Sequence, residues 1–140
     1  MIMFNNYELI LEVLNENGKS IKDLENNKIL AKNSFYVFSK TAPSLQILIK
    51  IANYLEVSID YILNRTLENN FRPYKFEQKM FYKKLTDILK SLNVSQSKIC
   101  KDLNISRTNF SRWKNGTQPS LTKLIAISNY LKCNIDDLLI

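Results

Sequence analysis

The sequence predicts an all-α fold made of two similar helical units in tandem. Only two glycines and three prolines occur among the 140 residues, and 45% of the residues are apolar, which suits helices joined by short polar turns better than strands. The second observation is an internal repeat, because residues 43–64 and 119–140 are identical at 12 of 22 positions. Two copies are too few for a solenoid, so we expect two globular domains.

The repeat continues upstream after a shift of one residue near 39–42. Phe35 then aligns with Phe110, and Phe38 aligns with Trp113. The stretch between the copies is polar, contains a proline and lacks helical spacing, as linkers do. We therefore predict a first domain, a linker and a second domain with these boundaries: 1–65, 66–75 and 76–140.

Each domain is expected to hold five short helices. In the second domain, apolar residues recur at helical spacing from Phe76 to Leu92. The helix that follows should bury Ile99, Cys100 and Leu103, and it should end at Asn104 in a left-handed turn. The expected N-caps of the second to fifth helices are, in order, Ser95, Ser106, Ser120 and Asn134.

The third helix of the second domain has two unlike sides. At 100° per residue, Phe110 and Trp113 fall on one side, which should pack against the second and fourth helices. The opposite side should face solvent and carries hydroxyl groups and two cations, from Arg107, Thr108, Ser111 and Arg112. A single arginine on a helix is usually only solvated, but the whole set favours contact with DNA.

The residue order from Ser95 to Leu121, SQSKICKDLNISRTNFSRWKNGTQPSL, continues into a regular pattern from Leu124 to Leu139. This order resembles the Cro/C1-type (XRE-like) helix-turn-helix domain of phage repressors and bacterial transcriptional regulators. The resemblance covers the whole second domain, and it extends to the first through residues 20–25, 43–45 and 57–63. It implies two tandem five-helix, lambda-repressor-like domains, with the third helix of the second domain in the major groove.

The chemistry of the third helix suits that role. Arg107 and Arg112 could each bind O6 and N7 of guanine, and short hydroxyl side chains can donate or accept hydrogen bonds at base edges. The resemblance places Gln96 where it contacts phosphate or braces the third helix. It also assigns backbone contacts to the residues that end this helix. The candidate DNA-binding residues are Gln96, Arg107, Thr108, Asn109, Ser111, Arg112, Lys114, Asn115 and Thr117.

The two domains are not equivalent in charge. Residues 1–68 contain seven Lys or Arg and eight Asp or Glu, whereas residues 69–140 contain 13 and five. Non-specific affinity for DNA comes mainly from the neutralisation of phosphates by cations. By this criterion only the second domain is well equipped to bind DNA.

The first domain also differs at the positions that align with the DNA-contacting side. Its residues there are Ile21, Lys32, Asn33, Tyr36 and Val37. Among them, Tyr36 and Val37 next to Ile21 would form an exposed hydrophobic patch. Such a patch tends to mark a protein contact. Two alternatives remain: Tyr36 could contact a thymine methyl group while its polar neighbours read bases, or the domain could be purely structural support.

The main functional prediction is a sequence-specific regulator of transcription, of the phage or mobile-element repressor type, that binds double-stranded DNA as a homodimer. The alternative is a protein-interaction module, such as an antitoxin or an antagonist of another regulator, because a fold does not fix a function. The steep salt dependence of phosphate contacts would distinguish them.

Other classes are disfavoured. The chain has no histidine and no glycine-rich phosphate loop, so we expect neither an enzyme nor a metal or cofactor site, and no small-molecule effector is indicated. Asp136 and Asp137 are explained as first-turn helix acids, and Cys100 and Cys133 as reduced core residues. The start of the chain lacks the features of a signal peptide, and no apolar run reaches ~20 residues. We therefore expect a cytoplasmic bacterial or phage-encoded protein without a membrane partner.

Overall fold

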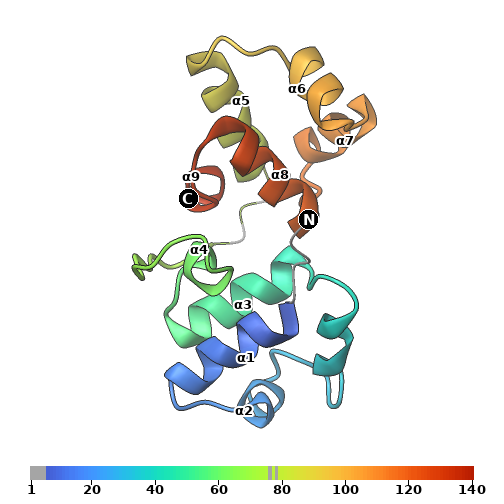
Figure 1. Ribbon diagram of the computed structural model, residues 1–140. Coiled ribbons are helices and arrows are strands. Elements are labelled where there is room, and N and C mark those ends of the chain that lie inside the picture. The colour runs from blue at the N-terminus through green and yellow to red at the C-terminus, as the bar shows by residue number, and fades with distance from the viewer. Residues whose placement is uncertain (1–5, 76, 78) are drawn as a thin grey trace. The chain divides into compact units, whose positions relative to one another are not determined.

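The computed structural model describes residues 6–75, 77 and 79–140, and the regular structure in that part of the chain is entirely helical (Figure 1). The chain divides into two compact units, Met1–Pro73 and Tyr74–Ile140, which we call the N-terminal and the C-terminal unit. Phe76, at the predicted start of the second domain, lies outside the described residues. None of the described helices has the length and apolar character needed to cross a membrane.

The described residues of the N-terminal unit form four α-helices and one 3₁₀ helix. They are α1 (Asn6–Glu16), α2 (Ile21–Asn26), η1 (Phe35–Ser39), α3 (Leu45–Leu55) and α4 (Ile59–Ile62). Helix α1 packs against η1 and α4. At the first of these contacts, the Phe35 ring lies 5.0 Å from that of Tyr7 and 5.4 Å from that of Phe38, measured between centroids. This aromatic cluster holds η1 against the core of the unit.

In the C-terminal unit, five α-helices are found among residues 74, 75, 77 and 79–140. They are α5 (Met80–Ser91), α6 (Gln96–Leu103), α7 (Arg107–Lys114), α8 (Leu121–Leu131) and α9 (Asp136–Leu139). Helix α5 packs against both α7 and α9. The core contains fully buried side chains from α5, α6, α8 and α9. They include Phe81, Leu85, Ile99, Leu121, Leu124 and Leu138.

The helices of the two units correspond in order, and α3 and α8 correspond in detail. Each has 11 residues, and each begins after a serine, Ser44 or Ser120, whose hydroxyl accepts a hydrogen bond from the backbone three residues later. Each also ends at a left-handed residue, Glu56 or Lys132. The predicted caps at Ser95 and Ser120 and the left-handed turn at Asn104 are observed.

Several local predictions are corrected by the structure. Ser106 occupies the N-cap position of α7, but its hydroxyl accepts no hydrogen bond from a helix amide. Asn134 does not cap α9, which begins after Ile135; instead, the Asp137 carboxylate accepts a hydrogen bond of 2.9 Å from the Asn134 amide. Leu103 is only half-buried.

The segment 66–75, predicted as a linker, makes contacts at both of its ends. The Asn69 side chain accepts a hydrogen bond of 2.9 Å from the Ser58 amide and donates one of 3.0 Å to the Glu56 carbonyl. The Tyr74 side chain is buried in the C-terminal unit, where its hydroxyl donates a hydrogen bond to Asp136. Asn69 and Tyr74 are therefore parts of the N-terminal and C-terminal units respectively.

The third helix of the N-terminal unit differs in type from α7, the third helix of the C-terminal unit. The structure has the 3₁₀ helix η1 instead, and Asn33 lies before it with a left-handed φ of 62°. The Glu25 carboxylate accepts a hydrogen bond of 2.9 Å from the Asn33 amide and holds the chain in this conformation. A left-handed residue cannot join a right-handed helix, so the helix starts later and remains short.

Candidate nucleic-acid interface

Helices α6 and α7 and the turn between them are fixed by local interactions. The Ser95 hydroxyl accepts a hydrogen bond of 3.0 Å from the Lys98 amide and so caps α6. The left-handed Asn104 ends α6, with φ of 55°, and Ile105 in the turn is buried. The next helix therefore starts at Arg107 with its direction set by a buried side chain in the turn.

Aromatic packing fixes the rotation of α7 about its own axis. Phe110 and Trp113 are 4% and 3% exposed. The Trp113 ring meets the Phe81 ring of α5 edge-on, with 5.2 Å between centroids and 86° between planes, and lies 5.0 Å from the Phe110 ring. The helical spacing predicted this buried side, but its aromatic partner is on α5, the first helix of the unit, and not on the second or fourth helix as expected. The packing leaves the opposite side of α7 to solvent.

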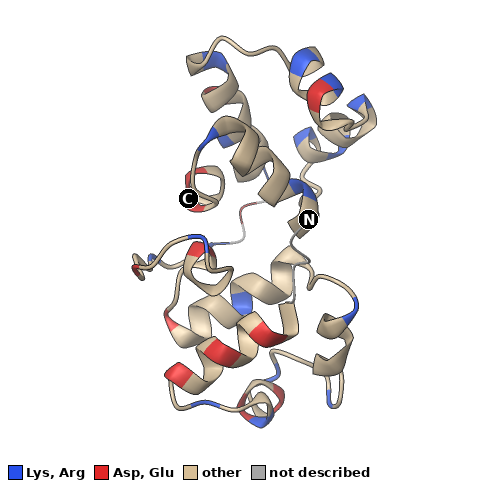
Figure 2. Cartoon of the chain, in the orientation of Figure 1, with Lys and Arg blue, Asp and Glu red and all other residues tan. Residues whose placement is uncertain are grey.

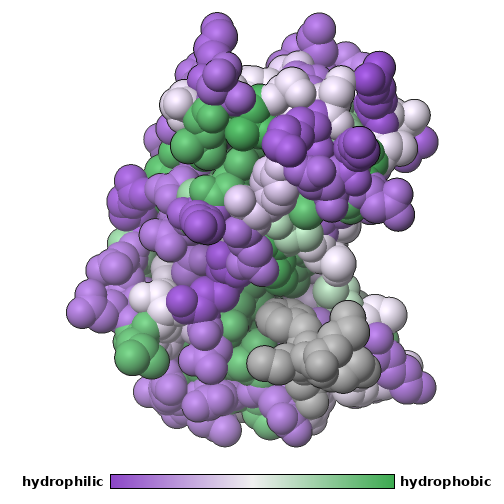
Figure 3. Space-filling model, turned by 45° about the horizontal axis from the view of Figure 1, so that its top comes forward, coloured by the Kyte–Doolittle hydropathy of each residue, from purple (hydrophilic) through white to green (hydrophobic). Residues whose placement is uncertain are grey.

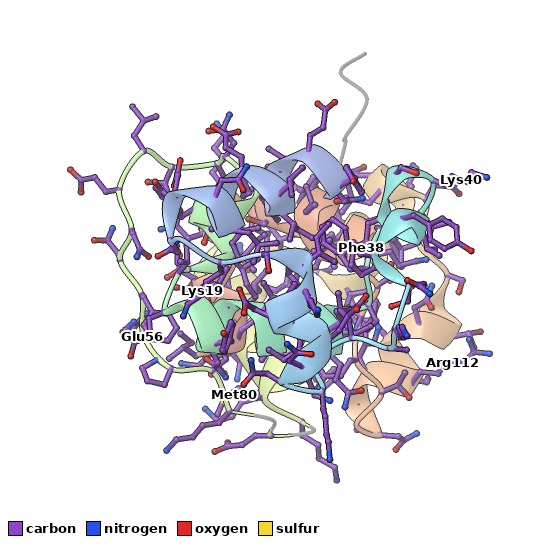
Figure 4. All side chains as sticks on the ribbon, turned by 90° about the horizontal axis from the view of Figure 1, so that it is seen from below. Lys19, Phe38, Lys40, Glu56, Met80 and Arg112 are labelled. Atoms are coloured by element: carbon purple, nitrogen blue, oxygen red, sulfur yellow. The ribbon has the colours of Figure 1, made fainter. Side chains whose placement is uncertain are left out.

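The outer side of α7 carries most of the candidate DNA-binding residues. Those whose side chains are exposed are Gln96, Arg107, Thr108, Ser111, Arg112, Lys114, Asn115 and Thr117. Asn109 differs, because it is half-buried and its amide donates a hydrogen bond of 3.3 Å to the Ser106 hydroxyl. Within the described part of the chain, the Arg112 guanidinium has no hydrogen-bond or ion-pair partner, and Figure 4 shows it extending away from the ribbon.

Four of the candidate residues line one pocket between α5, α6 and α7, with a volume of about 340 Å³. Its polar lining consists of Tyr82, Gln96, Ser97, Arg107, Ser111 and Lys114. Arg107 Nη2 donates a hydrogen bond of 2.9 Å to Ser97 Oγ, and Gln96 Nε2 donates a longer one of 3.4 Å to the Tyr82 hydroxyl. The lining contains two cations and no carboxylate, so the pocket favours an anion.

Sequence reasoning missed Tyr82 and Ser97. Ser97 is the second residue of α6, and its position near a helix start was the only available signal. Tyr82 gave no signal, because only the packing of α5 beside α6 brings its hydroxyl to the pocket.

The C-terminal unit carries the positive charge of the chain. It contains 12 Lys or Arg and five Asp or Glu, whereas the N-terminal unit contains eight of each. Figure 2 shows acidic residues along α1 and basic residues on α6 and α7. Four of the five acidic residues of the C-terminal unit have partners within the unit. Asp87 pairs with Lys83, and Asp102 pairs with Lys98 and accepts a hydrogen bond from Tyr130. Asp136 accepts a hydrogen bond from Tyr74, and Asp137 accepts one from the backbone N–H of Asn134.

Two ionisable groups near this region have shifted pKa values. Hydrogen bonds from the Tyr130 hydroxyl and from Lys98 lower the pKa of Asp102, so this carboxylate stays ionised. Burial raises the pKa of the Cys100 thiol, although the positive charge of Arg107 acts in the opposite direction. Cys100 is buried as predicted, whereas Cys133, expected in the core, is half-buried; both are free thiols.

The corresponding region of the N-terminal unit has a different surface. Tyr36 and Val37 are 63% and 38% exposed, while Ile21 is only half-buried. Lys32 and Asn33 are exposed, and the backbone N–H of Asn33 donates its hydrogen bond to the Glu25 carboxylate. Figure 3 shows a mostly hydrophilic surface in the view it gives, with hydrophobic residues reaching it in patches. Leu67, which is 91% exposed, is a further large apolar residue at the surface of this unit.

Comparison with known protein families supports the interpretation of the C-terminal unit. Residues 84–140 match the family model of the Cro/C1-type HTH (helix-turn-helix) DNA-binding domain. The match starts inside α5 and includes α6 to α9, and the family model shows no second copy in the chain. No curated protein and no solved structure matches the chain. Among the described residues, no group of three or more His, Cys, Asp or Glu could hold a metal ion.

Proposed function

We propose that this protein is a sequence-specific DNA-binding regulator of transcription, of the phage or mobile-element repressor type. The observation that carries the proposal is the packing of α7. Its aromatic side is buried, so the side rich in hydrogen-bond donors and cations faces solvent. A helix of this kind fits the major groove, where each base pair presents a distinct pattern of donors and acceptors. The family match to residues 84–140 supports the same role.

The proposed contacts follow from the positions of the side chains. Arg112 and Thr108 lie exposed on α7 and would reach base edges, while Ser111, also exposed, lines the pocket between α5, α6 and α7. The residues at the C-terminal end of α7 and just beyond it, Lys114, Asn115 and Thr117, would contact the phosphate backbone. Asn109 would support the start of α7 through its hydrogen bond to Ser106 rather than reach a base.

The N-terminal unit would be a diverged second copy of the same domain. Its support is the matching helix order, together with the equal lengths and matching caps of α3 and α8. In this proposal, the exposed Tyr36 and Val37 contact protein rather than DNA, and the chain acts as a homodimer. Such dimers bind two half-sites about one helical turn apart, so the operator would be a near-palindrome.

A second candidate function is a protein-interaction module, such as an antitoxin or an antagonist of another regulator. The observation that favours it is in the N-terminal unit, where an exposed apolar pair occupies the region that carries cations in the other unit. In this case the N-terminal unit would bind its partner and DNA contact would be secondary.

The test is a selection from a random pool of double-stranded DNA with three proteins: the whole chain, residues 1–73 and residues 74–140. We expect the whole chain and residues 74–140 to enrich a common motif, while residues 1–73 enrich none. Affinity for that motif should fall steeply with salt, because phosphate contacts release counterions. Enrichment of no motif by any of the three proteins would contradict the proposal and favour the protein-interaction module.

A further inference from the structure

The two arginines of α7 are held differently, although both belong to the same exposed side. The Arg107 guanidinium is tied to Ser97 of α6 by a hydrogen bond of 2.9 Å and lines the pocket between α5, α6 and α7. Arg112 has no such bond in the described part of the chain and does not line that pocket. A guanidinium has five N–H donors, so the bond to Ser97 leaves Arg107 with donors for a ligand in the pocket.

The other polar groups of the pocket are suited to the same kind of ligand. Lys114 supplies a second cation, Gln96 an amide, and Tyr82 and Ser111 supply hydroxyl groups. They come from three helices and converge on one volume of about 340 Å³ that has no carboxylate in its lining. A planar guanidinium binds a tetrahedral phosphate through two parallel hydrogen bonds, and an ammonium group adds charge.

We propose that this pocket binds one phosphate group of the DNA backbone, with Arg107 as its main ligand, and that Arg112 rather than Arg107 reads a base. The assignment rests on the proposed DNA-binding function. It gives the two ends of α7 different contacts, one with the DNA backbone and one with a base. Arg107, tied to α6, positions the helix on the backbone. Arg112, which has no partner among the described residues and lies about one and a half turns into the helix, extends toward the groove.

The N-terminal unit provides an internal comparison. In the sequence alignment of the two units, Glu25 stands at the position of Cys100, and Ile21 at that of Gln96. The Glu25 carboxylate is engaged by the Asn33 amide, beside the position equivalent to Arg107. Glu25 therefore puts a negative charge in this region of the N-terminal unit, where the lining of the pocket in the C-terminal unit has none, and a negative charge disfavours a phosphate nearby.

The first experiment measures DNA binding by the whole chain and by the exposed-residue variants Arg107→Ala, Arg107→Lys and Arg112→Ala. Affinity is determined across a range of salt concentrations, on the selected motif and on a scrambled duplex. We expect Arg107→Ala to weaken binding to both duplexes alike, by roughly tenfold, since a hydrogen bond to a charged group is lost. Its log–log salt slope should become shallower by about one, which corresponds to one phosphate contact.

The other two variants answer two separate questions. Arg107→Lys tests whether Arg107 acts through its charge or through its planar geometry, and Arg112→Ala tests whether Arg112 contacts a base or the backbone. Arg107→Lys should keep the salt slope but recover only part of the affinity, because an ammonium cannot bind bidentately. Arg112→Ala should weaken binding to the motif alone and relax the preference at one base pair. If Arg107→Ala instead weakens only the motif and relaxes a base preference, Arg107 is a base reader and the proposal is wrong.

A second experiment tests the pocket without DNA. Thermal unfolding of the whole chain is followed in inorganic phosphate and in sodium chloride of equal ionic strength. Phosphate stabilises folded proteins in general through exclusion from their surface, and a ligand that binds only the folded state adds to this. We therefore expect phosphate to raise the unfolding midpoint of the native chain and of Arg112→Ala by more than that of Arg107→Ala. An equal rise for the native chain and Arg107→Ala would overturn the phosphate pocket.

The two experiments together distinguish the source of the phosphate. A uniform loss of DNA affinity with a phosphate-dependent midpoint supports the DNA backbone as the source. If the native chain binds no DNA but phosphate still raises its midpoint through Arg107, both the proposed function and the backbone assignment are wrong. The pocket would then be a site for a free phosphate or a phosphorylated small molecule.

Discussion

Trp113 shows how a single residue connects stability to the candidate interface. Its ring is buried at 3% exposure between Phe81 of α5 and Phe110 of α7, and the same packing keeps the polar side of α7 outward. Aromatic pairs in this edge-on geometry add to the stabilisation that burial alone provides. Loss of the ring would therefore affect both the core and the orientation of the exposed residues.

We expect Trp113→Ala to lower the free energy of unfolding of the C-terminal unit by about 3–5 kcal/mol, the range found when large aromatic side chains are removed from a core. Urea unfolding followed by circular dichroism would measure the change. The control is Leu92→Ala, because Leu92 is an apolar residue of the same unit with 51% exposure. That variant should change stability by less than about 1 kcal/mol. Equal effects of the two variants would contradict the packing described for α7.

A second residue-scale prediction concerns Asp102 and pH. The Tyr130 hydroxyl is the largest cause of the lowered pKa of Asp102, and Lys98 adds to it. A carboxyl group whose pKa is lower in the folded state stabilises that state above its ordinary pKa. This contribution disappears as the pH falls through the lowered value.

Tyr130→Phe should therefore raise the pKa of Asp102 and reduce the loss of stability between neutral and acidic pH. The measurement is an NMR titration of the Asp102 carboxyl group in both proteins, with unfolding midpoints recorded across the same pH range. Asp137, which is held by the Asn134 amide and not by Tyr130, serves as the internal control. An unchanged Asp102 titration would show that the Tyr130 contact does not exist in solution.

At the scale of elements, two serines at helix starts offer a matched comparison. The Ser120 hydroxyl accepts a hydrogen bond of 3.2 Å from the Lys123 amide at the start of α8. Ser106 stands at the same position of α7 without such a bond, and its hydroxyl accepts only from the Asn109 side chain. A cap stabilises a helix by satisfying a free backbone amide, so only Ser120 should contribute in this way.

We expect Ser120→Ala to destabilise the C-terminal unit by about 1 kcal/mol and Ser106→Ala by clearly less. Both changes are measured as shifts in the urea unfolding midpoint at constant slope. Ser44→Ala in the N-terminal unit should behave like Ser120→Ala, because Ser44 caps α3 through the Ile47 amide. If Ser106→Ala proves as costly as Ser120→Ala, the capping described for α7 is wrong.

The elements that the sequence predicted best are those with strong local signals. The caps of α6 and α8 and the left-handed Asn104 follow from residue types that favour these positions. The predicted N-cap of α9 differs from the observed one by a single residue, although the bond from the Asn134 backbone N–H to the Asp137 side chain is of the kind found at a helix start. The left-handed Asn33 before η1 was not predictable, because its backbone N–H is held by Glu25, eight residues away.

The candidate interface was predictable where one helix suffices. Helical spacing separates Phe110 and Trp113 from Arg107 and Arg112 without knowledge of the neighbouring helices. The pocket required three helices to be placed together, so the contribution of Tyr82 and the bond from Arg107 to Ser97 could not be derived. The division of roles between the two arginines therefore depends on the structure.

At the scale of the whole molecule, Tyr74 decides where the C-terminal unit begins. Its side chain is 5% exposed, and its hydroxyl donates a hydrogen bond to Asp136, a carboxylate that is itself 8% exposed. Helix α9 thus depends on a residue that precedes the expected start of the domain at Phe76. A fragment that begins after Tyr74 would lose an aromatic side chain and would leave Asp136 without this donor.

We therefore expect the fragment 74–140 to be more stable than the fragment 76–140 by roughly 3 kcal/mol or more, because the shorter fragment loses the buried Tyr74 ring and its hydrogen bond to Asp136. Urea unfolding of the two fragments measures the difference. In the fragment 74–140, Tyr74→Phe keeps the ring and removes only the hydroxyl, so it should show an intermediate stability. Equal stability of the two fragments would mean that Tyr74 contributes little to the unit, and that the boundary lies where the sequence alone placed it. Tyr74→Phe separates the contribution of the buried ring from that of the hydroxyl. If this variant loses as much stability as the fragment 76–140, the hydrogen bond to Asp136 accounts for the difference between the fragments.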